Sequence, residues 1–332
     1  MQKRILTSAV SALILVQIAD VWAAESCSAE KLDLKLWLKP GQKFDMRLIT
    51  ELKGSETIEG REEHESFMFA WGMGFEVKEA DPNGVASVKV TYQTLQMKVI
   101  RAGGYHVEYD STKQSIADDY SKIPAIEAAG VGESFEMKVT PNGRIIELNG
   151  IERMHHRISE KVIGWDEKYV KTKYYERHRE SLQEMRRLNT KSYYSQEEIK
   201  NMLSDMIMFF PGRPLAIGDS WTHKVKIWGK NYEIDGTYIV KDRQKGTVII
   251  NLTANRTPEE KAFSWVNNQG REQRFKIVGS CKGSLEIDEQ TGWLIRSRVD
   301  MRFAGELIEK AGDKKMAQPI LQQEVITVER ME

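Results

Sequence analysis

The sequence has little of what most enzymes, metalloproteins and nucleic-acid-binding proteins require. It contains six histidines and two cysteines in 332 residues. Neither a Gly-x-x-x-x-Gly-Lys phosphate loop nor a Gly-x-Gly-x-x-Gly dinucleotide fingerprint occurs. Lys and Arg number 49, as do Asp and Glu, so the formal net charge is zero. This balance gives no reason to expect a nucleic acid or an anionic membrane as partner. We therefore predict no nucleic-acid partner and no cofactor.

One motif suggests hydrolase chemistry, but its partner residues are missing. Gly218-Asp219-Ser220 has the form that begins the nucleophile block of one lipase and esterase class. A serine nucleophile needs a histidine base and an aspartate that orients the base, usually as Asp-x-x-His near the C-terminus. No histidine lies beyond His223, and no histidine has an aspartate three residues before it. We predict that the protein is not an enzyme and has no catalytic residue.

Metal-ligand spacing is also absent from the sequence. His64-Glu65 would need a second histidine at the position of Met68. His155 and His156 are adjacent, so on a helix their side chains point about 100° apart and can hardly share one ion. The pair indicates solvated side chains on a charged helix face. We predict no metal-binding and no cofactor-binding residue, and the sequence leaves the ligand-binding residues unknown.

The first 24 residues have the pattern of a secretory signal peptide. Lys3 and Arg4 precede an apolar run over residues 5–18, and Val21 and Ala23 fit a small-residue cleavage site. The run is shorter than the ~20 residues that span a membrane. No later segment resembles a stop-transfer sequence. The pattern predicts an exported protein, periplasmic or extracellular, with no transmembrane span in the mature chain.

The two cysteines leave alternatives open. Cys27 could be the lipid-modified first residue of a lipoprotein, although Glu25 stands where that signal needs a small residue. In an oxidising compartment Cys27 and Cys281 could instead form a disulfide, and it is equally open that both stay free.

The pattern of the remaining residues indicates one β unit that occurs twice. Residues 38–44 and 215–221 share the pattern Leu-x-x-Gly-x-x-aromatic, and each leads into a strand. A hairpin with its turn at Gly84 or Gly246 follows, and its return strand alternates apolar with other residues. A second hairpin turns at Asn142-Gly143 in one copy and at Thr291-Gly292 in the other. The shared order predicts an internal duplication; the alternative is that any two β segments with glycine turns look alike.

A helical insert is predicted between the two copies. Apolar residues at steps of three and four define one face of a first helix, namely Ile151, Met154, Ile158, Val162, Trp165 and Tyr169. A second helix begins at Ser195, where Glu198 completes a capping box, and its apolar stripe continues from Ile199 to Phe210 before Pro211-Gly212 ends it.

These patterns together predict a mainly β fold with an α insert. We expect two similar antiparallel β units that form a curved sheet or half-barrel, with the amphipathic helices packed on it as a layer or lid. The predicted boundaries are a signal peptide at residues 1–24, a first β unit at 25–150, the helical insert at 151–212 and a second β unit at 213–332.

The segment Pro211-Gly212-Arg213-Pro214-Leu215-Ala216-Ile217-Gly218-Asp219-Ser220-Trp221 resembles an uncharacterised family of bacterial secreted and lipoprotein-like proteins. Family members are similar in this Pro-x-x-Pro-apolar-x-x-Gly-Asp-x-Trp entry, in a Leu-Lys-Pro-Gly entry that matches residues 38–41, and in the Thr291-Gly292 turn. Because the family has no assigned activity, the resemblance implies location and fold and transfers no catalytic or binding residue.

Three functional hypotheses remain. The first is a non-catalytic envelope protein that binds a partner or assists in assembly. The second is a periplasmic carrier of a lipid or another hydrophobic ligand, because methionines and aromatic residues concentrate in the insert and such side chains make adaptable apolar surfaces. A hydrolase is the third and least supported.

Overall fold

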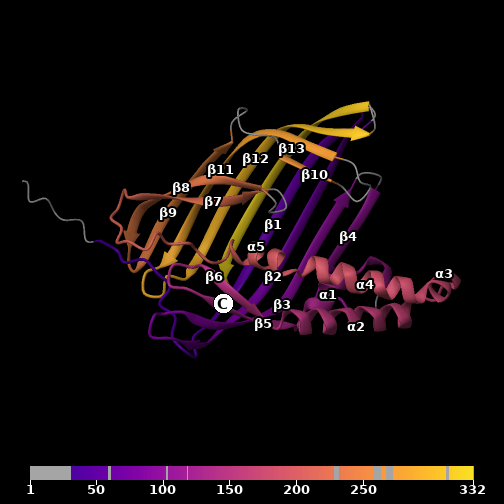
Figure 1. The fold of residues 1–332 in the computed structure, drawn as a ribbon, viewed down its shortest axis with the longest axis horizontal. Coiled ribbons are helices and arrows are strands. Elements are labelled where there is room, and N and C mark those ends of the chain that lie inside the picture. The colour runs from indigo at the N-terminus through magenta and orange to yellow at the C-terminus, as the bar shows by residue number, and fades with distance from the viewer. Residues whose placement is uncertain are drawn as a thin grey trace, which may run out of the picture.

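The computed structural model describes residues 31–58, 61–101, 104–117, 119–227, 232–256, 263–266, 272–311 and 314–331. Within this part of the chain, thirteen strands form one antiparallel sheet (Figure 1). The sheet is open and curled, and a few helices lie beside it. The predicted fold class, mainly β with an α insert, is therefore confirmed.

The first β segment runs from the middle of the sheet to one edge. Its strands are β1 (Lys43–Ile58), β2 (Arg61–Ala80), β3 (Ala86–Arg101), β4 (Tyr105–Asp110), β5 (Ser134–Val139) and β6 (Ile145–Asn149). The second segment runs from the opposite edge back to the middle. Its strands are β7 (Ser220–Ile227), β8 (Tyr232–Gln244), β9 (Thr247–Arg256), β10 (Phe263–Val266), β11 (Glu272–Asp288), β12 (Leu294–Ala311) and β13 (Lys314–Arg330).

The two segments share one sheet because β1 pairs with β13. The spatial order is β6-β5-β3-β2-β1-β13-β12-β11-β9-β8-β7, with β4 beside β3 and β10 beside β11. Read along the sheet, the order β1-β2-β3-β5-β6 of one segment matches the order β7-β8-β9-β11-β12 of the other. This order is compatible with the predicted duplication, and common descent stays a prediction, as do the domain boundaries.

The predicted hairpins and their alternation are present. Gly84 adopts φ 80° in the β2–β3 turn, and Lys245 and Gly246 adopt φ 49° and 81° between β8 and β9. Positive φ at two successive turn residues matches the right-handed twist of the flanking strands. On the return strands the predicted apolar residues are buried, and they are Val88, Val90, Tyr92, Val248, Ile250 and Leu252. These residues belong to one continuous hydrophobic core on the inner face of the curl.

The N-terminal segment packs across one end of the sheet. This packed end carries the hairpin turns at 81–84, 140–144, 245–246 and 289–293. Leu36 donates its backbone N–H to the carbonyl of Pro141 at 2.7 Å, and Trp37 donates to that of Thr291 at 2.9 Å. Four alternate side chains of the segment are buried, those of Leu32, Leu34, Leu36 and Leu38. The opposite end, where β1, β3 and β12 stop at Ile58, Arg101 and Ala311, is called the far end below.

Most of the helices lie against the edge of the sheet near β3 and β5, and the last one lies farther in, in front of the middle of the sheet (Figure 1). They are the 3-10 turn η2 (Tyr120–Lys122) and the helices α1 (Ala125–Gly130), α2 (Ile151–Tyr169), α3 (Lys173–Arg177), α4 (Arg179–Tyr193) and α5 (Gln196–Leu203). The predicted face of α2 is confirmed, because Ile151, Met154, Ile158 and Val162 are buried. Helices α2 to α4 thus form a layer at one side of the sheet, whereas Ile199 and Leu203 of α5 are buried in the main core.

The second predicted helix begins as expected but ends early. The Ser195 hydroxyl accepts the backbone N–H of Glu198, as the capping pattern predicts. The helix was expected to reach Phe210, and it stops at Leu203. Phe210 instead donates its backbone N–H to Asn142, and the Phe209 ring stacks on His223 of β7 at 4.1 Å. The extended backbone after α5 thereby joins the β5–β6 turn to β7, which a continued helix could not do.

Glycines on the inner face allow adjacent strands to approach closely. Gly305 of β12 faces Ile277 of β11, and a β-carbon on Gly305 would collide with the backbone oxygen of Lys276. A β-carbon on Gly279 of β11 would likewise collide with the backbone oxygen of Arg302. A glycine inside a strand often marks such a close approach or a bend.

We expect Gly305→Ala to lower the free energy of unfolding by about 1–3 kcal/mol, because the added methyl group must displace backbone. Gly54 of β1 is the matched control on the same face, since its β-carbon would meet its nearest neighbour, the Glu65 side chain, at 3.5 Å. Gly54→Ala should leave stability unchanged or raise it slightly. Urea denaturation of both variants measures the difference, and an equal effect would contradict the close approach.

Candidate functional site

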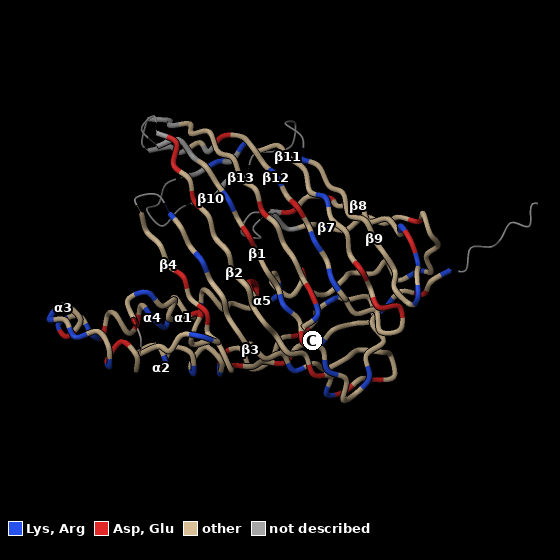
Figure 2. The backbone as a smooth tube through the Cα atoms, turned by 180° about the vertical axis from the view of Figure 1, so that it is seen from behind, with Lys and Arg blue, Asp and Glu red and all other residues tan. Residues whose placement is uncertain are grey.

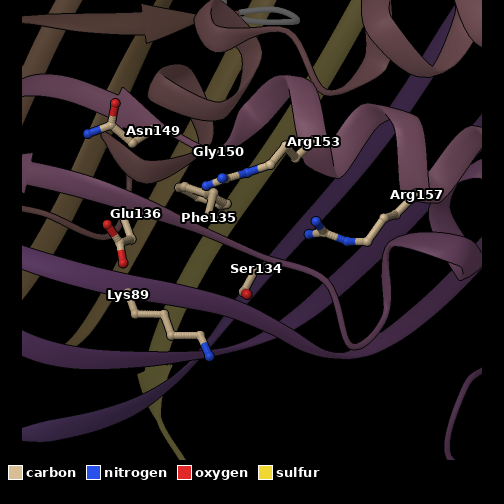
Figure 3. A pocket seen from close by; sticks show the side chains of 8 residues that line it. All are labelled: Lys89, Ser134, Phe135, Glu136, Asn149, Gly150, Arg153 and Arg157. Carbon is tan, nitrogen blue, oxygen red and sulfur yellow. The ribbon is translucent and has the colours of Figure 1, made fainter.

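A pocket of about 230 Å³ lies on the outer face of the sheet beside the start of α2 (Figure 3). Its walls come from β3, β5, β6 and α2, through Lys89, Ser134, Phe135, Glu136, Asn149, Gly150, Arg153 and Arg157. Lys89 alternates with the buried Val88 and Val90, and therefore points away from the core. In Figure 3, Arg153 and Arg157 point from α2 toward the sheet, and Lys89 runs along its strand on the other side of Ser134.

The pocket is lined by three cationic side chains and one carboxylate, that of Glu136. Arg157 donates Nε to the buried Glu133 at 2.6 Å, and Lys161 donates to the same carboxylate at 3.2 Å. Glu133 lies outside the lining. Gly150 directly precedes α2, with φ 83°, and offers no side-chain cap. The arrangement can attract a small anion.

A second candidate surface is the inner face of the sheet at the far end. Register pairs Leu52 of β1 with Phe67 of β2, and Phe67 with Val99 of β3. An apolar cluster forms there, separate from the main core, from Met97, Val99 and Val107 with the partly exposed Phe67 and Phe69. Leu52 is also partly exposed. Neighbouring large apolar side chains that are only partly covered indicate a surface that can accept an apolar ligand.

Polar side chains lie on the same inner face, next to the apolar ones. On β13, Gln322 and Glu324 are buried and stand opposite Gly54 and Leu52 of β1. On β9, the buried Arg256 donates Nε to the carbonyl of Ile277 at 3.1 Å. The inner face therefore carries buried polar side chains between the main core and the far end.

The Gly218-Asp219-Ser220 segment forms a turn at the entry to β7. The Asp219 carboxylate accepts the backbone N–H of Ala216 at 3.0 Å, and this bond, helped by Arg213, lowers the pKa of Asp219. Ser220 and His223 are three residues apart on one strand, so their side chains point to opposite faces. His223 is half-buried, and desolvation lowers its pKa. The structure does not bring these residues together as a nucleophile and its base.

The expectation of a solvated histidine pair on α2 is wrong for one member. His155 is buried, and its Nε2 lies 2.8 Å from the carbonyl oxygen of Tyr194, whereas His156 is exposed. The packing of α2 against the residues after α4 encloses His155. Across the described residues, no group of three or more His, Cys, Asp or Glu side chains is placed to hold a metal ion.

Cys281 lies on β11, fully enclosed in the core and without a disulfide among the described residues. Burial raises the pKa of its thiol to about 12, so the thiol is protonated at neutral pH. Cys27 and the signal-peptide residues 1–24 lie outside the described residues. Pairing of the two cysteines and lipidation of Cys27 stay predictions.

Sequence reasoning missed every residue of the outer pocket. Lys89 and Arg153 are separated by most of the first β segment, and nothing in the sequence predicts that they meet. Arg153 and Arg157 are four residues apart on the charged face of α2, which was the one available signal. None of the helices within the described ranges has the length and apolar character needed to cross a membrane.

The chain is therefore a curled antiparallel sheet protein with one helical layer and two candidate binding surfaces. Residues 83–294 match the model of the Family of unknown function (DUF6263), and the chain belongs to that family. Among solved structures it is similar to one described as "Lipid-protein interactions in lipovitellin", with a TM-score of 0.44 and 7% sequence identity. That likeness covers 89% of this chain and 25% of the other, and at this level it carries no functional argument. No curated protein matches the chain.

Proposed function

We propose that the protein is a non-catalytic, exported protein of the bacterial cell envelope that binds a hydrophobic ligand. The observation that carries the ligand proposal is the partly exposed apolar surface on the inner face at the far end. Export rests on the leader pattern of residues 1–24. The mass of the mature N-terminal peptide tests that part separately.

Alternation along the strands supports this assignment. Leu52, Phe67 and Val99 stand side by side on three neighbouring strands, so they form one patch facing the inside of the curl. In contrast, ion pairs form on the opposite face, Arg298 with Asp300 on β12 and Lys98 of β3 with Glu108 of β4, as expected of a surface in contact with water. Residues of both charge signs occur along adjacent strands (Figure 2). Covering apolar area contributes about 25 cal/mol per Å² to binding before the cost of association is subtracted.

The packing of the insert supports a site at the far end and not under the helices. Tyr194, Ile199 and Leu203 are buried in the same continuous core as Tyr92 of β3 and Val240 of β8. The Tyr92 and Tyr194 rings contact edge to face at 5.6 Å. A ligand between these helices and the sheet would have to displace packed side chains, whereas the far end offers exposed apolar surface without that cost.

A matched pair of variants tests the proposal. Leu52→Asp places a charge in the inner apolar patch, whereas Leu321→Asp places the same charge on the outer face of the neighbouring strand β13, where Leu321 is 46% exposed. We expect Leu52→Asp to lower the affinity for a fluorescent fatty acid by about tenfold or more, because burying an unpaired carboxylate is costly. Leu321→Asp should bind as the unmodified protein does.

Mass spectrometry of gently purified protein provides the second readout. We expect co-purified lipid with the unmodified chain and with Leu321→Asp, and less of it with Leu52→Asp. Circular dichroism establishes that both variants are folded. Equal fatty-acid binding by the two variants, or no lipid with any of them, would reject a hydrophobic ligand at this surface.

Binding of a partner protein is the second candidate function. Four large apolar side chains of the helical layer are exposed, Tyr174 at 66%, Met185 at 45%, Leu188 at 59% and Tyr193 at 37%. Met185 and Leu188 are three residues apart on α4 and are neighbours on its surface. Cross-linking in the envelope that captures one reproducible partner through α4, together with failure of the lipid experiment, would favour this function.

A further inference from the structure

The outer pocket carries positive charge that the protein does not use for its own packing. Arg153 and Lys89 form no ion pair with a described residue, and Arg157 engages Glu133 through Nε alone. The two terminal nitrogens of Arg157 make no hydrogen bond within the described part of the chain. Arg157, Arg153 and Lys89 therefore present donors to the pocket, which has the carboxylate of Glu136 in its lining. Glu76 of β2, the other strand neighbour of Lys89, pairs with Lys78 at 2.8 Å.

The pocket is held in place before any ligand arrives. The Glu133 side chain is 10% exposed and fixes both Arg157 and Lys161, which lie four residues apart on α2. Asn149 donates its side-chain amide to Glu147 at 2.7 Å, which orients the β6 wall. Because Arg157 and Asn149 are already held by these contacts, binding requires less loss of their conformational freedom than it would at mobile surface side chains.

From this geometry we propose that the outer pocket binds the phosphate group of a phosphate ester. Guanidinium groups present planar, paired donors that match phosphate oxygens, and the lysine adds a point charge. A volume of about 230 Å³ exceeds what a bare phosphate fills, so the pocket has room for a small group attached to the phosphate. Ser134 and Glu136 can then form hydrogen bonds with hydroxyl groups of the group attached to the phosphate.

The phosphate ester could be soluble, or it could be the headgroup of a phospholipid. Both present the same chemistry to Lys89, Arg153 and Arg157. The pocket lies on the outer face, whereas the apolar patch around Leu52 and Phe67 lies on the inner face. A ligand in the outer pocket therefore does not require a ligand on the inner patch. The phosphate proposal and the hydrophobic-ligand proposal can fail independently.

Calorimetric titration with glycerol 3-phosphate tests the pocket, with glycerol as the uncharged comparison. We expect glycerol 3-phosphate to bind with an affinity that falls as salt is added, and glycerol not to bind. Arg153→Gln and Lys89→Gln should each weaken binding by about tenfold. Arg179→Gln on α4 removes an exposed arginine outside the pocket and should leave binding unchanged.

Flotation with vesicles identifies the source of the phosphate. Binding to phosphatidylglycerol vesicles but not to phosphatidylcholine vesicles, lost in Arg153→Gln, would assign a lipid headgroup. Binding of glycerol 3-phosphate without vesicle binding would assign a soluble ester. If neither probe binds, or if Arg179→Gln weakens binding as much as Arg153→Gln, the phosphate site is overturned, whatever the fatty-acid experiment shows.

Discussion

Replacing Trp293 with alanine is expected to lower the free energy of unfolding by about 4 kcal/mol. Trp293 is 1% exposed and directly precedes β12. Its ring stacks on Phe44 of β1 at 4.5 Å and meets the edge of Phe75 of β2 at 5.2 Å. The side chain therefore connects the second β segment to the first at the packed end, and its removal leaves a cavity where several strands meet.

Two other tryptophan variants serve as controls for this result. Trp293→Phe keeps a stacked ring and removes an indole N–H that has no hydrogen-bond partner among the described residues, so we expect a loss of only about 1 kcal/mol. Trp37 is 50% exposed with the Lys35 ammonium 3.9 Å from its ring, and Trp37→Ala should cost under about 1 kcal/mol. Denaturant unfolding followed by far-ultraviolet circular dichroism compares the three. A Trp293→Ala protein as stable as Trp37→Ala would contradict this role.

Local patterns made part of the fold predictable. Positive φ at Gly84 and Gly246 is a property of the turn itself, so glycine marks the hairpins directly in the sequence. Likewise, Met154 and Ile158 are buried on one face of α2 because their spacing follows the helical period. These features depend on residues that are close in the chain, and a pattern over a short window records them.

Pairing between distant strands was not predictable in the same way. Alternation in β1 indicates a strand with one buried face, but it does not say that Leu48 stands opposite Val328 of β13. That pairing converts two β segments into one sheet.

Helix α4 was not predicted, for a different reason. Thr190 is its one buried residue, so the helix has almost no apolar stripe for a pattern to find.

Neither candidate surface could be predicted from the sequence, because each brings together residues that are distant in the chain. The outer pocket needs Lys89 of β3 beside Arg153 of α2, and their proximity follows from how α2 packs against β5. The inner patch needs Phe67 beside Leu52, which follows from the register of β1 and β2. The composition in Met and aromatic residues suggested an apolar surface in the insert, but many of those residues, including Met206 and Phe210, are buried in the core.

A second large effect is expected at the centre of the helical layer. Arg186 of α4 donates Nε to Oδ2 of Asp166 at 2.8 Å and Nη2 to Oδ1 at 3.1 Å. The Tyr120 hydroxyl donates to the same carboxylate at 2.7 Å. The Asp166 side chain is 4% exposed, so Arg186→Ala would leave a buried carboxylate without its cation. We expect a loss of about 3 kcal/mol.

The neighbouring arginine supplies the matched control for this ion pair. Arg187 lies 3.3 Å from Glu160, but their side chains are 45% and 47% exposed, and water screens such a pair. Arg187→Ala should therefore change stability by less than about 1 kcal/mol. Urea denaturation compares the two variants, and amide hydrogen exchange in α2 and α4 locates the effect, which should be faster exchange in Arg186→Ala alone. Equal losses in both variants would mean that the helices are held by their apolar contacts and that the Asp166 pair is dispensable.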